Sequence, residues 1–189
     1  MTVDEIYLNL SKHMIQGIMS HEQWSEYYSF LNLRGYSACH FFHYLKETLS
    51  YHELCEYYIN HHNKLINETE FEAPTIIPAN WYRYTRQDVD ANTKRNAVKT
   101  ALDMWAEWEK STKKLYEESY KELLAIDEIA SAMFVKELIC DVDCELKKVQ
   151  KYQLNKEAVN YDIVSIMEEQ HHKHKKYKKK IEEVCKELC

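Results

Sequence analysis

Four polar side chains of this chain have the types and spacing to hold a metal ion together: Gln16, His52, Glu109 and Asp141. Each falls about midway along a predicted long helix, and residues equally far from the turn of an antiparallel hairpin lie at the same height. Carboxylates combined with one imidazole nitrogen suit Fe(II) and similar divalent ions. Glu145, one helical turn beyond Asp141, extends the set. The spacing therefore predicts a metal site in one mid-height layer.

Simpler interpretations apply to the same residues. An inward-facing His52 could be a hydrogen-bonded core residue, and Glu109 and Asp141 could pair with lysines of neighbouring helices. Val142 also competes with Asp141 for the inward position on its helix. These alternatives stay open on sequence grounds.

A basic segment near the C-terminus offers a second set of ligands. His171, His172 and His174 are followed by a lysine-rich run that ends at Lys180. The histidines could bind metal near a pore or inside an oligomer, and the lysines could contact an acidic surface. The segment could equally be a solvated helix end, where lysines complement the helix dipole.

The elements that must position these residues are predicted to be helices. Apolar residues recur at helical spacing over about 3–33, 37–66, 91–124 and 128–154, and a fifth helical segment covers 156–189. The predicted inward stripe of the first segment is Ile6, Leu10, Met14, Gly17, His21, Trp24, Tyr28 and Leu31. That of the second is Phe41, Leu45, Thr48, His52, Cys55 and Ile59. The third runs through Val98, Leu102, Trp105, Glu109, Thr112, Tyr116, Ser119 and Leu123, and the fourth through Phe134, Leu138, Asp141, Glu145, Lys148 or Val149, and Tyr152.

The connections between the segments predict the architecture. Short turns join the first two segments near Gly35 and the next two near Ile126, whereas residues 67–90 hold both prolines and break the helical pattern. Two hairpins joined by one long crossover form the ferritin-like variant of the four-helix bundle. We therefore expect an all-α bundle domain over 1–155, followed by a fifth helix and basic tail over 156–189.

Composition narrows the range of partners. The chain has 189 residues, two Gly, two Pro and a net charge of −6. The last 20 residues contain seven Lys and three Glu, so the preceding body is strongly acidic, which disfavours nucleic acid and favours cations. The sequence has no apolar run long enough to span a bilayer and no visible secretory signal, and its cysteines do not suggest disulfides. A cytoplasmic protein is the resulting expectation.

Three motifs resemble those of the ferritin family, in the same order along the chain. Residues 35–59 look like the second ferritin helix, with an opening Gly, a His-Phe-Phe and a Tyr-Tyr-Ile ending. Glu72-Ala73-Pro74 with the later Trp81 resembles the family's crossover, and residues 107–116 resemble its third-helix Glu-x-Glu-Lys motif.

The resemblance implies a particular ligand set. It matches His52 and Glu109 to iron ligands, and places Asp141 near the fourth-helix ligand. The bridging Glu of the second helix is replaced by Leu49, and the first-helix Glu falls near Gln16 or Gly17. Four glutamates could substitute but are expected on a solvated face: Glu22, Glu47, Glu53 and Glu56.

The resemblance also implies a function. A hollow homo-oligomer of 24 subunits would take up Fe(II), oxidise it slowly or atypically, and store ferric mineral. Two alternatives remain: a small di-metal carboxylate oxidoreductase, and a structural or interaction bundle without metal.

Overall fold

The computed structural model describes residues 1–66 and 89–187, and the regular secondary structure of these ranges is entirely α-helical. The helices are α1 (Val3–Phe30), α2 (Arg34–His62), α3 (Ala91–Ala125), α4 (Ile129–Ala158) and α5 (Ile163–Glu187). The all-α prediction is confirmed, and each predicted segment corresponds to one helix, with bounds that differ by a few residues. The predicted crossover falls almost wholly on residues 67–88, outside the described residues. The fifth helix begins later than predicted because α4 continues to Ala158.

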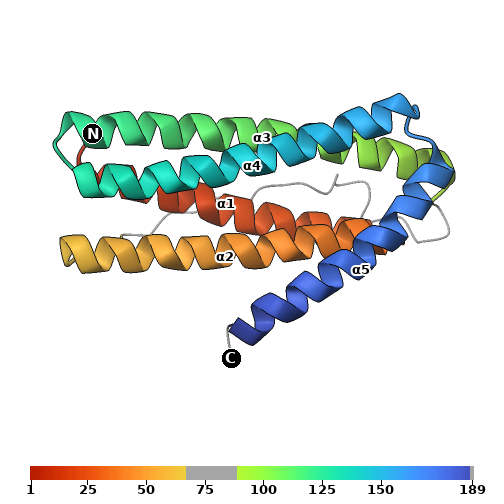
Figure 1. The fold of residues 1–189 in the computed structure, drawn as a ribbon, viewed down its shortest axis with the longest axis horizontal. Coiled ribbons are helices and arrows are strands. Elements are labelled where there is room, and N and C mark those ends of the chain that lie inside the picture. Colours follow the sequence, from red (N-terminus) through yellow and green to blue (C-terminus); the bar gives the residue numbers. More distant parts are fainter. Residues whose placement is uncertain (67–88, 188–189) are drawn as a thin grey trace.

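The four long helices form two hairpins, α1 with α2 and α3 with α4, which lie side by side (Figure 1). Asn32 and Asp127 make the two tight turns in the left-handed region, with φ of 58° and 59°. Asn and Asp are the non-glycine residues that tolerate this conformation best. Two helices also begin at side-chain caps: Thr2 and Glu5 form a capping box on α1, and Asp90 accepts the Thr93 N–H on α3.

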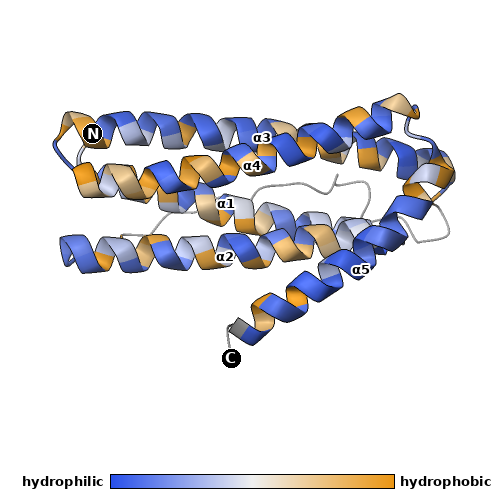
Figure 2. Cartoon of the chain, in the orientation of Figure 1, coloured by the Kyte–Doolittle hydropathy of each residue, from blue (hydrophilic) through white to orange (hydrophobic). Residues whose placement is uncertain are grey.

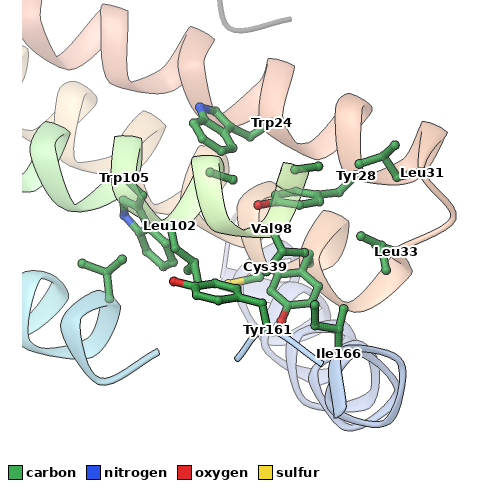
Figure 3. Close-up of a cluster of buried hydrophobic side chains, with 14 of the residues drawn as sticks. Trp24, Tyr28, Leu31, Leu33, Cys39, Val98, Leu102, Trp105, Tyr161 and Ile166 are labelled. Atoms are coloured by element: carbon green, nitrogen blue, oxygen red, sulfur yellow. The ribbon is translucent and has the colours of Figure 1, made fainter. Parts of the chain in front are cut away.

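Two apolar clusters fill the bundle, one toward each end. The first joins all five described helices around Trp24, Tyr28, Val98 and Trp105 (Figure 3). The second surrounds Leu10 near the start of α1 and Leu123 near the end of α3, among others. Every residue of the predicted inward stripes of α1 and α3 is buried, so those two predictions are confirmed. Between the clusters lies a layer of buried polar side chains.

Helix α5 crosses the bundle diagonally and packs on α2 (Figure 1). It is mostly hydrophilic in Figure 2, and buried Ile166 and Tyr177 provide its apolar contacts. Glu169 pairs with Lys156 and, at 3.0 Å, with Lys173. The Lys173 ammonium also lies 3.7–4.1 Å from the ring centroids of two buried or half-buried tyrosines, Tyr152 and Tyr36. None of the described helices is long and apolar enough to cross a membrane.

Candidate metal centre

The face of helix α2 that lies against the core is not the face that carries its apolar residues, which was the predicted one. The His52 side chain is 68% exposed, and its Nε2 lies 3.5 Å from Glu56 Oε1, on a residue that is also exposed. The predicted inward position of His52 is therefore wrong. The error has a physical cause: Phe41 and Ile59, which defined the predicted stripe, are each 40% exposed. The inward face carries polar residues instead.

Three of the polar residues in the layer come together from three helices: His21 of α1, Glu47 of α2 and Glu109 of α3. One ligand atom of each lies within 4.8 Å of the others. His21 and Glu109 are buried, and Glu47 keeps 25% of its side chain accessible. The expectation of a solvated Glu47 is wrong. Ser50, three residues after Glu47, lines the adjoining cavity. The inward-facing pair of α2 is therefore Glu47 and Ser50, offset by two residues from the Leu49 and His52 positions that the resemblance matched.

Gly17 makes room for this carboxylate. A Cβ at Gly17 would lie 2.7 Å from Glu47 Oε2 and 3.2 Å from the Trp108 ring. Any larger residue at position 17 would displace the Glu47 side chain. The neighbouring Gln16, a predicted ligand, is half-buried, and its carbonyl accepts a hydrogen bond from Ser20 Oγ at 2.7 Å. Gln16 is not part of the three-residue group.

Hydrogen bonds orient two members of the group. Trp105 Nε1–H donates to Glu109 Oε1 at 2.8 Å. His21 Nδ1 lies 2.9 Å from His40 Nδ1, so one imidazole donates to the other. His21 Nε2 is buried without a hydrogen-bond partner among the described residues, and the closest Glu47 oxygen is 3.7 Å away. When His21 donates through Nδ1, its Nε2 offers a lone pair to the space between the two carboxylates.

Burial shifts the pKa of each member away from the charged form. Desolvation, with repulsion from Glu109, raises the pKa of Glu47 to about 8. Desolvation likewise raises the pKa of Glu109 to about 7. It lowers the pKa of His21 to about 3, with a further contribution from Lys148. Without a cation, the layer at neutral pH therefore holds a neutral imidazole, a mostly protonated Glu47 and a Glu109 that is only partly ionised.

This donor set fits a divalent metal ion. A bound cation would keep both carboxylates ionised and would satisfy the unpartnered His21 nitrogen. Bonds of about 2.1 Å place ligand atoms roughly 3–4 Å apart, a distance that modest side-chain rotation reaches from the observed arrangement. Two oxygens and one nitrogen suit Fe(II), Mn(II) or Zn(II).

A small cavity of about 50 Å³ adjoins the three-residue group on the α4 side. Glu145 lines it and is 18% exposed, with its two oxygens facing Lys46 and Lys148. Asp141 also lines it, but its side chain is 66% exposed and lies 3.9 Å from Lys46. Val142 is the buried residue of this turn, so the inward assignment of Asp141 is wrong. Of the five predicted core ligands, Glu109 and Glu145 lie in the buried layer.

The histidines of the C-terminal segment lie elsewhere. His171 and His172 are exposed on α5, and His174 Nδ1 lies 3.4 Å from the Arg34 carbonyl oxygen. Across residues 1–66 and 89–187, the three-ligand group found is His21, Glu47 and Glu109, and none of the α5 histidines belongs to it.

His21 also borders a larger cavity, of about 440 Å³. Three tryptophans, Trp24, Trp105 and Trp108, line it together with Met104. His40 borders it as well. The imidazole of the metal group therefore lines the larger cavity, whereas Glu47 and Glu109 line the smaller one.

No protein-family model matches this chain, and no curated protein is significantly similar to it. The functional argument therefore depends on the geometry and chemistry of the site.

Proposed function

We propose that this chain binds Fe(II) at His21, Glu47 and Glu109 and stores iron in a ferritin-like homo-oligomer. The observation that carries the proposal is a buried group of two carboxyls and one unpartnered imidazole nitrogen, supplied by three helices. Uncompensated buried carboxylates are costly, and a divalent cation removes that cost. Two helical hairpins followed by a fifth helix, and the sequence resemblance to ferritins, support the iron-storage interpretation.

Each residue has a distinct part in this proposal. Glu47 and Glu109 neutralise the charge of the cation, and Trp105 holds one Glu109 oxygen in place. His40 fixes the His21 tautomer through the Nδ1–Nδ1 hydrogen bond. Fe(II) is the substrate, and O2 oxidises it to the ferric form that is stored. A cage of 24 subunits would hold the mineral, and the acidic surface of the chain favours cation uptake.

Replacing Glu47 or Glu109 with Gln is expected to weaken Fe(II) binding by more than about 100-fold, since even residues that only support metal ligands are worth 10–100-fold. Each substitution removes an anionic ligand with little change in volume. Anaerobic equilibrium dialysis with iron analysis measures the affinity, and light scattering on the same sample measures the oligomer.

Glu107→Gln is the matched control, because Glu107 lies on the same helix, is 72% exposed and pairs only with Lys110 among the described ion pairs. Its Fe(II) affinity should equal that of the wild type. A wild-type protein without bound iron would contradict the metal site and favour the structural bundle. An iron-binding monomer or dimer would contradict storage while leaving the metal site in place.

The tryptophan-lined cavity favours a second candidate function, oxidation of a small apolar molecule by a metal-dependent oxidoreductase. Three tryptophans and Met104 give it mostly apolar walls, Asp103 and Glu107 also line it, and His21 lies on its border. A dye with an apolar aromatic body, such as the anionic anilinonaphthalene sulfonate, should then bind one site per chain and gain fluorescence. Met104→Glu, which places a charge at the cavity, should weaken this binding at least tenfold, whereas Met133→Glu on the exposed surface of α4 should not. Equal binding by both variants would contradict a cavity ligand.

A further inference from the structure

We propose that the metal centre is mononuclear because the Lys148 ammonium occupies the position of a second metal ion. This inference rests on the proposed metal site and specifies how many cations it holds. The α4 side of the layer has a second pair of potential ligands, His43 of α2 and Glu145 of α4, whose nearest atoms are 3.7 Å apart. Both border the same small cavity as Glu47 and Glu109.

Lys148 lies between these two potential ligands. Its Nζ is 2.8 Å from His43 Nε2 and 2.8 Å from Glu145 Oε2. A metal ion in this place would need the same nitrogen and the same oxygen. The ammonium group is also 5.7 Å from the ring centroids of Trp105 and Tyr177, whose π faces favour a cation. The side chain is therefore held by four neighbouring groups.

The charges around the cavity balance with one divalent ion. Four acidic residues line it, Glu47, Glu109, Asp141 and Glu145. Lys46 pairs with Asp141 and Glu145, and Lys148 pairs with Glu145, which leaves two negative charges when all four carboxylates are ionised. One M²⁺ between Glu47 and Glu109 neutralises them. A second would add two uncompensated positive charges beside an ammonium group in a poorly solvated site, which is strongly unfavourable.

The count of bound Mn(II) tests this directly. Equilibrium dialysis should give one Mn(II) in the core of the wild-type chain, counted as the difference from Glu109→Gln, which removes the core site. Lys148→Met keeps the side-chain length and deletes the charge, so it should bind two. Lys148→Gln is a second variant with a polar replacement and the same expectation. Lys147→Met, at an exposed position of the same helix, should still bind one.

Electron paramagnetic resonance gives an independent measure, because two neighbouring Mn(II) ions couple magnetically and one does not. The wild type should show an isolated ion and Lys148→Met a coupled pair, with circular dichroism confirming that each variant is helical. Two core ions in the wild type, or one in both helical Lys148 variants, would overturn the mononuclear inference alone. No core metal in any of the proteins would overturn the proposed function itself.

Discussion

Gly35→Ala is expected to release α5 from the bundle, although alanine is a better helix former than glycine. A Cβ at position 35 would lie 1.8 Å from the Gln170 carbonyl oxygen and 2.6 Å from its carbonyl carbon. Because these are backbone atoms of α5, no side-chain rotation can relieve the overlap. The helix must move, and the contacts that depend on it, such as Lys173 over the Tyr36 ring, must lengthen.

The expected loss is about 1–3 kcal/mol or more, which overpacking typically costs, against a gain of up to about 1 kcal/mol from helix propensity. Hydrogen exchange should show faster exchange of the α5 amides, and the thermal midpoint should fall. Gly17→Ala is the comparison, because its new Cβ meets the flexible end of Glu47 at its closest contact, so α5 should stay protected. Undiminished α5 protection together with a raised midpoint in Gly35→Ala would show that the two helices do not approach this closely.

The fold was largely predictable because most of its helices follow ordinary rules. Stripes such as Val98, Leu102 and Trp105 keep apolar residues at helical spacing, and all of them are buried. The turns at Asn32 and Asp127 also carry residue types that tolerate left-handed backbone. The placement of α5 was less predictable, since it depends on the contact of Gly35 with a residue far away in the sequence.

The site was only partly predictable because α2 inverts the usual distribution of polar and apolar residues. It buries His40 and His43 and leaves Phe41 substantially exposed. A stripe built on the apolar residues therefore selected His52 and placed Glu47 on the surface. One available signal pointed correctly: His21 lies on the confirmed stripe of α1, 14 residues before the predicted turn at Gly35, and Glu47 lies 12 residues after it. Comparing residues at the same height, but on the polar face of α2, would have paired His21 with Glu47.

Without metal, the stability of the protein is expected to rise toward about pH 6.5 and to fall again up to about pH 8. The fall comes from Glu47 and Glu109, whose pKa values are raised to about 8 and about 7 by burial. In the unfolded chain both ionise near pH 4.5. Between these values the folded chain holds more protons, so stability decreases with pH by at most about 1.4 kcal/mol per unit for each carboxyl. Lys46, and Lys148 near Glu109, oppose the shift, but burial is the larger effect.

The buried histidines produce the rise at lower pH. Burial lowers the pKa of His21 to about 3 and those of His40 and His43 well below their usual value. Below about pH 6.5 the imidazoles of the unfolded chain bind protons, whereas the buried imidazoles of the folded chain stay neutral. Stability is therefore lost as the pH falls. The two opposing groups place the maximum of the metal-free protein near neutrality.

A divalent cation should remove the alkaline fall, because it binds the ionised carboxylates of the folded chain in place of their protons. Denaturant unfolding between pH 5.5 and 8.5, with a chelator or with Zn(II), measures both curves. The chelated protein should weaken steadily above pH 6.5, and Zn(II) should stabilise it increasingly over the same range. A Glu47→Gln, Glu109→Gln double variant has no carboxyl to ionise at these two positions. Its stability should neither fall above pH 6.5 nor increase with Zn(II). Constant stability of the chelated wild type from pH 6.5 to 8.5 would mean that these carboxyls are already ionised in the fold, and that the cation is not needed to keep them so.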